Sequence, residues 1–239
     1  MSISTDELHP VASDVTVNTE EVVLKQAMAT DITYDRIMSK TATLSRYQMP
    51  KVIPVVDVIR HLNEARISFV LVGAYGLARW RKESRATEDV DVVVAAKQLK
   101  KAASLLLAAY PHLEAVDLPV VIRLRDRETQ DVVIDLMKPM DQPYREVFKN
   151  AQRESIEGQP CRVPTLEMAL VMKFSAMTSA NRQVEDKYRD AHDFIRMVKN
   201  NAEIDEAKVA ELASLISASG GKYILEMIAD ARANRTLKL

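Results

Sequence analysis

The sequence predicts an α/β (α+β) fold, in which a mixed sheet is flanked by helices and followed by a helical C-terminal region. Helical and strand patterns alternate between residues 55 and 137, which favours a sheet with helices on its faces. After residue 164 the apolar residues recur mainly at helical spacing. We therefore expect three regions: an N-terminal arm or short helix at 1–51, a sheet domain at 52–160 and a helical region at 161–239.

Composition and charge limit the classes of protein that the chain can represent. At 239 residues and 47% hydrophobic, it can bury a full core. A net charge of −1 gives no general attraction to nucleic acid, so any such contact requires a local basic patch. The single cysteine, Cys161, excludes an internal disulfide, and the four scattered histidines do not suggest a transition-metal site. With no signal peptide and no apolar run of about 20 residues, we expect a cytoplasmic protein without membrane contact.

The elements of the first half follow from hydrophobic periodicity. Residues 1–50 show no clear period, and only Glu20–Met38 suggests a short helix there. Apolar residues at helical spacing predict a helix over Val55–Ala65. A strand, a short helix, a strand and a long helix are expected next, at Ile67–Val72, after Gly76, at Asp89–Val94 and at Ala95–Tyr110.

The elements of the second half begin with a hairpin. Two strands, Val116–Arg125 and Asp131–Met137, flank a polar loop. A short helix is expected over Tyr144–Gln152 and an edge strand at Cys161–Val163. Four helices then complete the chain, at 165–177, Val184–Lys199, Asp205–Ser217 and Lys222–Asn234, the last two separated by Gly220-Gly221.

Two of the five glycines, Gly73 and Gly76, follow the apolar run Ile67–Val72 and precede a helical pattern. Glycine permits close backbone approach and dihedral angles that other residues resist. A strand ending in such a turn presents free backbone N–H groups at the start of a helix, where they can bind phosphate. A strand-to-helix turn without a ligand uses glycines too, so the turn alone does not decide between the two interpretations.

Asp89 and Asp91 lie two residues apart on an expected strand, so both carboxylates point to one face. Carboxylates this close repel each other unless a cation lies between them. The valines around them indicate a buried strand rather than a solvated strand end. A third carboxylate, Asp135, has apolar neighbours, although Asp131 on the same strand has comparable spacing. A phosphate-binding turn beside paired carboxylates is what Mg2+-assisted nucleotidyl transfer requires.

In this order, Gly73-Ala74, Asp89-Val90-Asp91 and Asp135 resemble the motifs of the nucleotidyltransferase superfamily, in its minimal and abortive-infection toxin-like branches. The later stretches LEMALVMKFSAM and KYRDAHDF are similar to the helices of the toxin-like members that carry a lysine and Asp-x-x-Asp. The resemblance covers roughly residues 55–198. It implies a nucleotidyltransferase fold and a Mg2+-dependent enzyme that moves an NMP from an NTP to an acceptor. It also implies that the chain is the toxin of a toxin–antitoxin pair, with an antitoxin as partner.

The resemblance assigns roles to individual residues. Asp89, Asp91 and Asp135 are expected to be catalytic and to bind the metal. The residues expected to bind the NTP are Gly73, Ala74, Gly76, Thr87, Lys173 and Asp190. The family usually has Gly or Ser where this chain has Ala74, which offers no hydroxyl to a phosphate. The acceptor is expected to be an RNA end, such as that of tRNA, a protein or a small molecule.

Lys173 lies in a mostly apolar helical stretch, Met168–Met177. A lysine there extends to solvent, pairs with a carboxylate of the next helix, or reaches a nucleotide phosphate. The expected partners are Asp190 and Asp193, which share a helix face because they are three residues apart.

Four cations occur within seven residues between the glycine turn and the aspartates: Arg79, Arg81, Lys82 and Arg85. They form either a solvated loop or a patch at the rim of the site that binds the phosphates of an acceptor. We expect the second, with a polyanionic acceptor.

Two other functions use the same residues. The chain could be a non-catalytic nucleotide-binding or toxin–antitoxin interaction module, and Ala74 is the feature that favours this alternative. It could also be a phosphohydrolase that uses the same carboxylates. Metal-dependent NTP binding separates an enzyme from an interaction module, and release of pyrophosphate separates transfer from hydrolysis.

Overall fold

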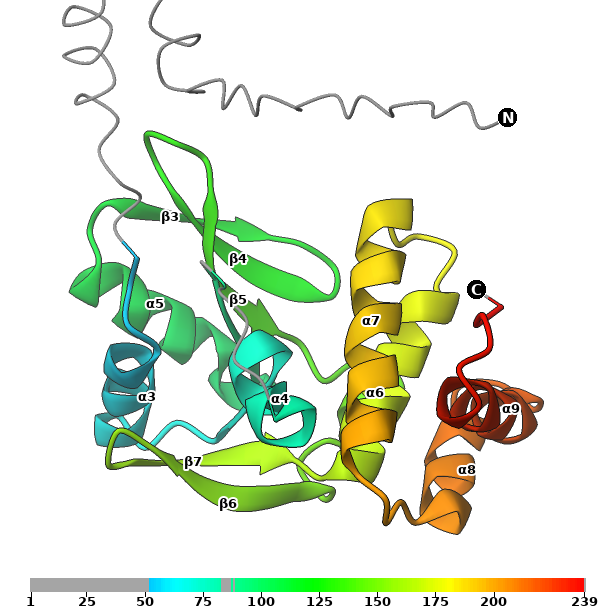
Figure 1. Cartoon of the computed structure of the whole chain (residues 1–239). Helices are drawn as coiled ribbons and strands as arrows, with labels where there is room; N and C mark the ends of the chain where they lie inside the picture. The colour runs from blue at the N-terminus through cyan, green and yellow to red at the C-terminus, as the bar shows by residue number, and fades with distance from the viewer. Residues whose placement is uncertain (1–51, 83–86, 88, 239) are drawn as a thin grey trace, which may run out of the picture. The chain divides into compact units, whose positions relative to one another are not determined.

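The computed structural model describes residues 52–82, 87 and 89–238. The N-terminal arm at 1–51, including the helix expected in Glu20–Met38, and the loop residue Arg85 lie outside these described residues. The described residues belong to one compact unit, in which a sheet packs among helices (Figure 1). No helix among them is long and apolar enough to cross a membrane.

A five-stranded sheet forms the centre of this unit, with the strand order β1-β2-β5-β4-β3. The strands are β1 (Phe69–Leu71), β2 (Val90–Val94), β3 (Leu113–Asp117), β4 (Val121–Asp126) and β5 (Val132–Met137). Strands β2 and β5 are parallel, and the other neighbouring pairs are antiparallel. The mixed sheet expected from the sequence is therefore confirmed.

One face of the sheet packs against helices α3 (Val55–Glu64) and α5 (Leu99–Ala109). Successive strand residues point to opposite faces. On β2, Val90, Val92 and Val94 therefore join this core, whereas Val93 joins a second core on the opposite face. Asp91 shares that opposite face with Val93 because the two residues are two apart.

The second core joins the sheet to the C-terminal helices. These helices are α6 (Leu166–Thr178), α7 (Val184–Asn200), α8 (Glu206–Ser214) and α9 (Gly220–Arg232). Leu77 of α4 (Gly73–Arg81) packs in the same cluster as Phe174 and Phe194. The Thr165 hydroxyl accepts the Met168 N–H at 3.3 Å and so caps the start of α6. The shared cluster holds helices α6 and α7 against the face of the sheet that carries Asp91.

A second, two-stranded sheet is the hairpin of β6 (Ala151–Ile156) and β7 (Gln159–Pro164). Cys161 and Val163 on β7 pack into the core beneath α3. The expected domain boundary between residues 160 and 161 falls inside β7, so it does not separate two units.

Three expected elements are corrected by the structure. The segment Val116–Arg125 is two strands, because a turn at residues 118–120 separates β3 from β4. The helix expected over Tyr144–Gln152 is a single 3-10 turn, η2 (Tyr144–Glu146), followed by β6. Gly220 and Gly221 begin α9 rather than separate two helices. A Cβ on Gly220 would lie 2.2 Å from the Ala213 carbonyl oxygen, so glycine allows α9 to pack closely on α8.

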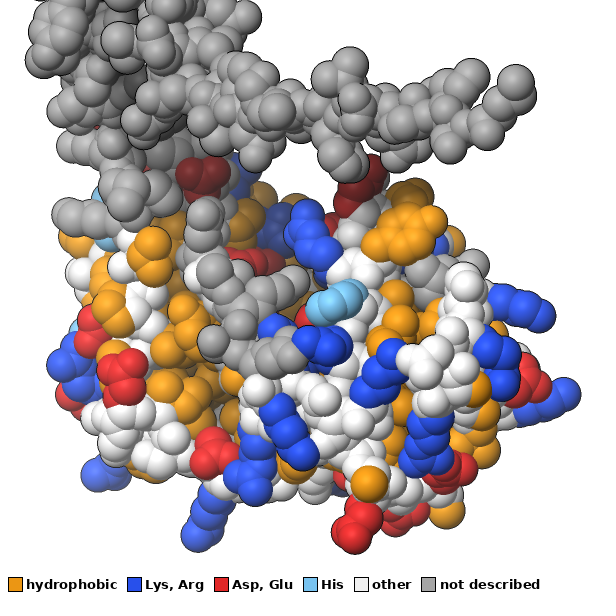
Figure 2. All heavy atoms as spheres, in the orientation of Figure 1, with side chains coloured by type: hydrophobic (Ala, Val, Ile, Leu, Met, Phe, Trp, Pro, Cys, Tyr) orange, Lys and Arg blue, Asp and Glu red, His pale blue; other side chains and the backbone are white. Residues whose placement is uncertain are grey.

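Charged side chains of both signs lie on the face of the molecule that Figure 2 shows. Lys and Arg are interspersed with Asp and Glu over the lower part of the face in Figure 2. This distribution fits the net charge of −1. Any site for a polyanion must therefore be a local one.

Candidate active site

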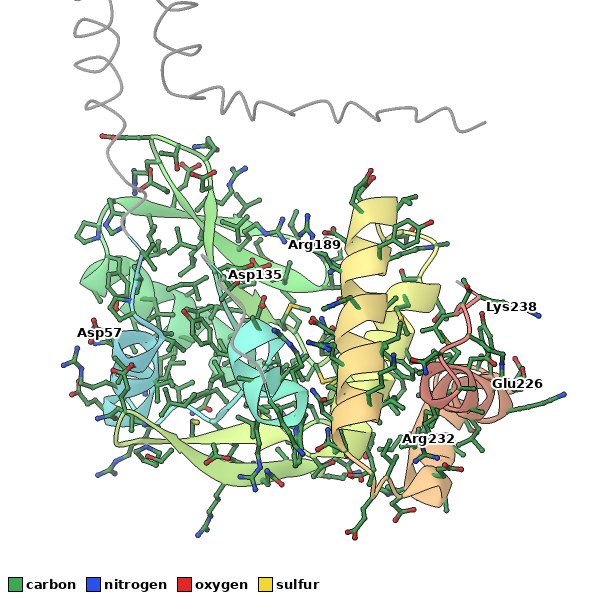
Figure 3. All side chains as sticks on the ribbon, viewed as in Figure 1. Asp57, Asp135, Arg189, Glu226, Arg232 and Lys238 are labelled. Carbon is green, nitrogen blue, oxygen red and sulfur yellow. The ribbon has the colours of Figure 1, made fainter. Side chains whose placement is uncertain are left out.

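The strand register places two carboxylates and one arginine in a row across the sheet. Asp91 on β2 is aligned with Asp135 on β5, and Asp135 is aligned with Arg123 on β4. Asp135 is 7% exposed and lies in the interior, whereas Asp57, Glu226 and Arg232 lie at the periphery (Figure 3). The structure therefore brings Asp91 and Asp135 together, as the sequence analysis expected.

Asp131, the alternative third carboxylate, is exposed and lies before the first residue of β5. It is separated along the chain from the row in which Asp91 and Asp135 are aligned. The apolar flank of Asp135 thus identified the residue that faces Asp91.

The turn before α4 brings the backbone of Gly73 against the carboxylate of Asp91. Gly73 has a φ of +58°, and a Cβ at this position would lie 1.9 Å from Asp91 Oδ2. The residue that precedes α4, Val72, provides no side-chain cap to the first N–H groups of the helix. These N–H groups and the helix dipole are available to an anion next to Asp91.

Ala74 and Gly76 have different positions from Gly73. Gly73 lines the cavity described below, whereas Ala74 is buried and neither Ala74 nor Gly76 is among the lining residues. A Cβ on Gly76 would lie 2.3 Å from the Leu71 carbonyl oxygen. Gly76 therefore permits close packing of α4 on β1, and the side chain of Ala74 does not face the site.

The carboxyl group of Asp91 is electrostatically unfavourable in its charged form. Its pKa is raised to about 7, mainly by burial and further by the nearby carboxylates of Asp89 and Asp135. Lys173 and Arg182 act in the opposite direction and lower the pKa by a smaller amount. Among the described residues, no basic side chain forms an ion pair with Asp91.

Asp135 already has a partner. Arg123 Nε and Nη2 donate to the two oxygens of Asp135 at 2.9 and 2.8 Å, which is a bidentate pair. The hydrogen bonds to Asp135 raise the pKa of Arg123. Asp89 instead accepts a hydrogen bond from the hydroxyl of Thr87.

The chemistry of these groups fits a magnesium ion only in part. Oxygen ligands from carboxylates are the ones that Mg2+ prefers, and a cation would relieve the repulsion around Asp91. Within the described part of the chain, however, no three His, Cys, Asp or Glu side chains stand together as a metal site. Asp89 and Asp91 have no basic partner there, whereas Asp135 is held by Arg123.

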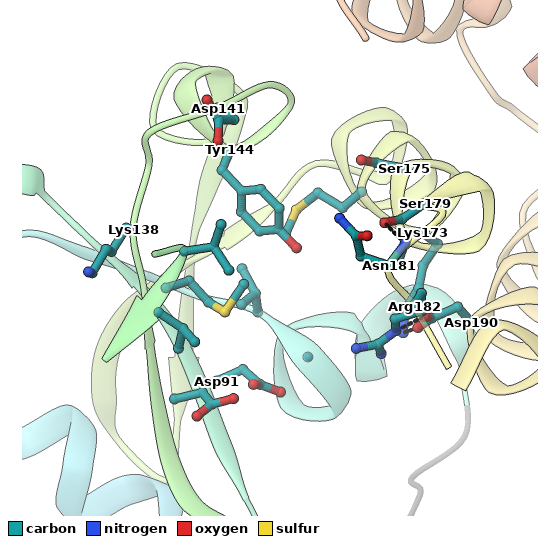
Figure 4. A pocket seen from close by; sticks show the side chains of 18 of the residues that line it. Asp91, Lys138, Asp141, Tyr144, Lys173, Ser175, Ser179, Asn181, Arg182 and Asp190 are labelled. Atoms are coloured by element: carbon teal, nitrogen blue, oxygen red, sulfur yellow. Dashed lines mark hydrogen bonds and ion pairs between the residues drawn. The ribbon is translucent and has the colours of Figure 1, made fainter. Parts of the chain in front are cut away.

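A basic wall faces the carboxylate row. Lys173 Nζ lies 2.7 Å from Asp190 Oδ1 and 2.8 Å from Asp193 Oδ2, so both partners expected for Lys173 are confirmed. Arg182 Nε contacts the other oxygen of Asp190 at 3.0 Å. Figure 4 shows Lys173, Arg182 and Asp190 on one side of the cavity and Asp91 on the other.

A cavity of about 440 Å³ joins the carboxylate row to the basic wall. At its end remote from Asp91, the cavity is lined by the uncharged side chains of Tyr144, Ser175, Ser179 and Asn181 and by one carboxylate, that of Asp141 (Figure 4). Burial raises the pKa of Tyr144 to about 12, so its hydroxyl stays protonated. The cavity thus has one strongly charged end and one end of lower charge.

The basic loop does not have the position that the sequence analysis expected. Arg81 is only 4% exposed and faces Asp193 at 3.4 Å, so it cannot contact an acceptor at the surface. Arg79 pairs with Glu154 at 2.6 Å and lies over the Trp80 ring. Neither of them lines the cavity, and nor does the exposed Lys82. Arg85 lies outside the described residues.

Three residues of the site were missed by the sequence analysis: Arg123, Arg182 and Tyr144. Arg123 alternates with the apolar residues of β4, and this pattern predicts that its side chain lies on the polar face of the strand. Arg182 lies in a connection, and Tyr144 lies in a segment expected to be helical. Their approach to the site depends on tertiary packing, so local pattern gave no signal for them.

A strand that turns through glycine into a helix, beside aligned carboxylates on the next strands, places the protein among the nucleotidyltransferases. Residues 58–239 match the family described as "Nucleotidyl transferase AbiEii toxin, Type IV TA system". This match spans most of the chain, and the chain belongs to this family. The expected resemblance to the abortive-infection toxin-like branch is therefore confirmed, and the protein is a transferase by class.

Solved structures with a similar fold are distant from this chain. An antigenic nucleotidyltransferase-like protein from Paracoccidioides brasiliensis is 17% identical, with a TM-score of 0.46, over 77% of this chain and 92% of that one. ANT(2'')-Ia, solved with adenylyl-2''-tobramycin, is 10% identical, with a TM-score of 0.44, over 74% and 94%. The lincosamide antibiotic adenylyltransferase LnuA is 15% identical, with a TM-score of 0.42, over 60% and 94%. No curated protein matched the sequence.

Proposed function

We propose that the protein is a toxin that transfers an NMP from an NTP to the end of an RNA, with Mg2+ bound at Asp89 and Asp91. The alignment of Asp91 with Asp135, directly against the Gly73 turn, is the observation that supports this proposal most strongly. It places carboxylates beside free helix N–H groups, so a metal and a phosphate can bind next to each other.

The charged end of the cavity suits the triphosphate. The first N–H groups of α4 and the cations Lys173 and Arg182 provide donors from two sides. Positive charge held in place before the reaction stabilises the charge that develops on departing pyrophosphate. The lower-charge end, with the ring of Tyr144, then accommodates the nucleoside.

A bound Mg2+ ion would supply positive charge that offsets the negative charge of the carboxylates and of the phosphates. Asp89 and Asp91 are the residues that would hold it. Asp135 would complete the site or accept the proton of the acceptor hydroxyl, through the lone pairs that its bidentate contact with Arg123 leaves free. Arg123 therefore orients the carboxylate of Asp135.

An RNA end is the acceptor that the charges favour. Arg123 and Lys138 line the cavity, and the side chain of Arg123 is 37% exposed. An exposed arginine beside a carboxylate site suits the phosphates that flank a reactive hydroxyl. This cationic lining replaces the loop at residues 79–85 as the proposed place for the acceptor.

The proposal is tested by incubating the protein with each NTP, labelled on the α-phosphate, and with cell RNA, protein and small-molecule fractions. Label is expected in RNA, with release of pyrophosphate and dependence on Mg2+. Label in protein or in a small molecule would show that the acceptor belongs to that class and not to RNA. Inorganic phosphate without transferred label would identify a phosphohydrolase, and absence of any turnover would overturn the proposal.

Replacement of Lys173 with Met is expected to weaken both nucleotide binding and folding. The lysine contacts two carboxylates whose side chains are 4% and 1% exposed, so its loss leaves buried negative charge under-compensated. The free energy of unfolding should fall by about 3 kcal/mol, and the KM for NTP should rise at least about tenfold. Thermal unfolding and an NTP titration measure the two effects.

The matched control is Lys208→Met on α8. Lys208 pairs with Glu211 at 3.0 Å on the surface, so its loss should change neither quantity measurably. If Lys173→Met changes neither the unfolding temperature nor the KM, Lys173 does not belong to the site.

A further inference from the structure

A chain of ion pairs extends from the cavity into the interior of the protein. It begins at Arg182 and Asp190, continues through Lys173 to Asp193, and ends at Arg81. Asp190, Asp193 and Arg81 are 3%, 1% and 4% exposed, respectively. Among the described residues, the ion pairs therefore connect Arg81 to the cavity through Asp193 and Lys173.

Arg81 is held in this buried position by its helix. Ala74, Leu77 and Arg81 follow one another at spacings of three and four and are all buried, so Arg81 shares the inner face of α4. Its backbone carbonyl accepts a hydrogen bond from the side chain of Asn200, at the end of α7. Nη1 of Arg81 is buried without a hydrogen-bond partner among the described residues.

The contact of Arg81 with Asp193 depends on charge rather than on aligned hydrogen bonds. Arg81 Nε and Lys173 Nζ lie 3.4 and 2.8 Å from the two oxygens of Asp193. Neither oxygen has a hydrogen bond of acceptable geometry within the described residues. Burial of an arginine without aligned hydrogen bonds is energetically costly, because its charge loses its hydration. We therefore asked what the charge of Arg81 contributes to the cavity.

The balance of positive and negative charges along the chain of ion pairs indicates this contribution. Lys173 and Arg182 alone would be neutralised by Asp190 and Asp193, and the cavity wall would carry no surplus charge. Arg81 adds one positive charge to this set. At the exposed edge, Asp186 approaches Arg182 at 3.9 Å, but Asp186 is itself paired with Arg189.

We propose that Arg81 is a positioning residue that neutralises the charge of Asp193 from the side remote from the cavity. The charge of Lys173 then remains available to a triphosphate in the cavity. Without Arg81, movement of Lys173 toward a phosphate would leave Asp193 buried and unpaired, which is strongly unfavourable. With Arg81 in place, Asp193 keeps a counter-charge while Lys173 moves. This inference rests on the proposed function, since it concerns the same phosphate-binding end of the cavity.

The experiment measures the Kd for inorganic triphosphate in the presence of a chelator, so that no metal contributes, and the Kd for NTP in parallel. Arg81→Met should weaken triphosphate binding on the order of tenfold. Asp193→Asn should strengthen triphosphate binding by a similar factor, because removal of this carboxylate leaves more of the positive charge of Arg81 and Lys173 uncompensated. The double variant should bind as the wild type does, and Arg81→Lys should retain most of the affinity.

Arg79→Met is the matched control, because Arg79 is on the same helix but is paired with Glu154 away from the cavity. It should leave triphosphate binding unchanged. A purely structural role of Arg81 predicts lower unfolding temperatures without the restoration of affinity in the double variant.

The outcomes separate this inference from the proposed function. Unchanged affinity in Arg81→Met, or no restoration by Asp193→Asn, overturns the role of Arg81. If Arg81→Met does not fold, Asp193→Asn alone decides, because unchanged or weaker triphosphate binding overturns the inference. Triphosphate binding that follows the expected order, without any transfer of label, overturns the proposed function alone. A wild-type protein that binds no triphosphate overturns both.

Discussion

Replacement of Asp91 with Asn is expected to abolish nucleotidyl transfer and, at the same time, to stabilise the metal-free protein. Loss of a charged ligand at the proposed metal site should lower kcat/KM more than about a hundredfold. The stability change has the opposite sign because Asn removes a carboxylate that is partly buried and lies near Asp89 and Asp135. A structural residue would lose stability and activity together, so the opposite signs are diagnostic.

The gain in stability should depend on pH. The pKa of Asp91 is about 7 in the folded protein and 3.8 in its ordinary state, so the folded state binds more protons between these values. Metal-free wild-type protein therefore loses stability as pH rises from about 4 to about 7, and Asp91→Asn lacks this loss. At pH 8 the variant should be more stable by roughly 1–3 kcal/mol, because water in the cavity screens part of the repulsion that acts on the charged carboxylate.

Denaturant unfolding in a chelator at pH 5 and pH 8, together with transfer of labelled NMP, measures these effects. Asp131→Asn is the matched control, because Asp131 is an exposed residue just before β5, the strand that carries Asp135, and neither quantity should change. Transfer by Asp91→Asn at close to the wild-type rate would remove Asp91 from the catalytic machinery.

The sequence was sufficient to predict the faces on which Asp91 and Asp135 lie, but not the groups that surround them. The two-residue period of a strand predicts the face of Asp91, and the alternation in β5 places Asp135 opposite its apolar neighbours. The expected strand Asp89–Val94 is one residue too long, because β2 begins at Val90 and Asp89 lies just before it. The parallel pairing of β2 with β5 aligns Asp91 with Asp135, and this pairing joins segments that lie far apart in the sequence. No local pattern specifies such a pairing, and for the same reason the bidentate contact of Arg123 with Asp135 was not predicted.

The error at Arg81 has a different cause, because the information was present in the sequence. Arg81 was grouped with Arg79 and Lys82 as one basic loop. Helix α4 continues through Arg81, however, and its period turns Arg81 inward with Leu77 while Arg79 points outward. Extension of the expected helix by one turn would have separated the buried Arg81 from the exposed Arg79 and Lys82. Only the structure shows that Asp193 is the partner of Arg81.

Replacement of Gly73 with Ala is expected to remove transfer activity with a moderate loss of stability, whereas Gly76→Ala should mainly destabilise the fold. At Gly73 the added methyl group would overlap the carboxylate of Asp91, whose Oδ2 would be 1.9 Å away, and the φ of +58° is unfavourable for alanine. Asp91 must therefore move away from the site. The loss in the free energy of unfolding should be about 1–2 kcal/mol, mainly from the left-handed backbone.

At Gly76 the methyl group would lie 2.3 Å from the Leu71 carbonyl oxygen, which belongs to the backbone of β1 and cannot rotate away. Helix α4 would have to shift from the strand, with a cost of about 3 kcal/mol or more. In Gly76→Ala protein that still folds, Asp91 should keep its position. Any remaining loss of transfer activity should then result from the displacement of α4 and not from the loss of a metal ligand.

Gly158→Ala separates backbone strain from overlap with Asp91. Gly158 has a φ of +80° in the β6–β7 turn, with nothing within 4 Å of an added Cβ. Its replacement should cost about 1–2 kcal/mol of stability and leave transfer intact. Thermal unfolding of the three variants, followed by transfer assays at a temperature where each is folded, makes the comparison. If Gly73→Ala transfers NMP as well as Gly158→Ala does, the glycine turn is only a connection between strand and helix, and close approach of Asp91 to the backbone is not required for the reaction.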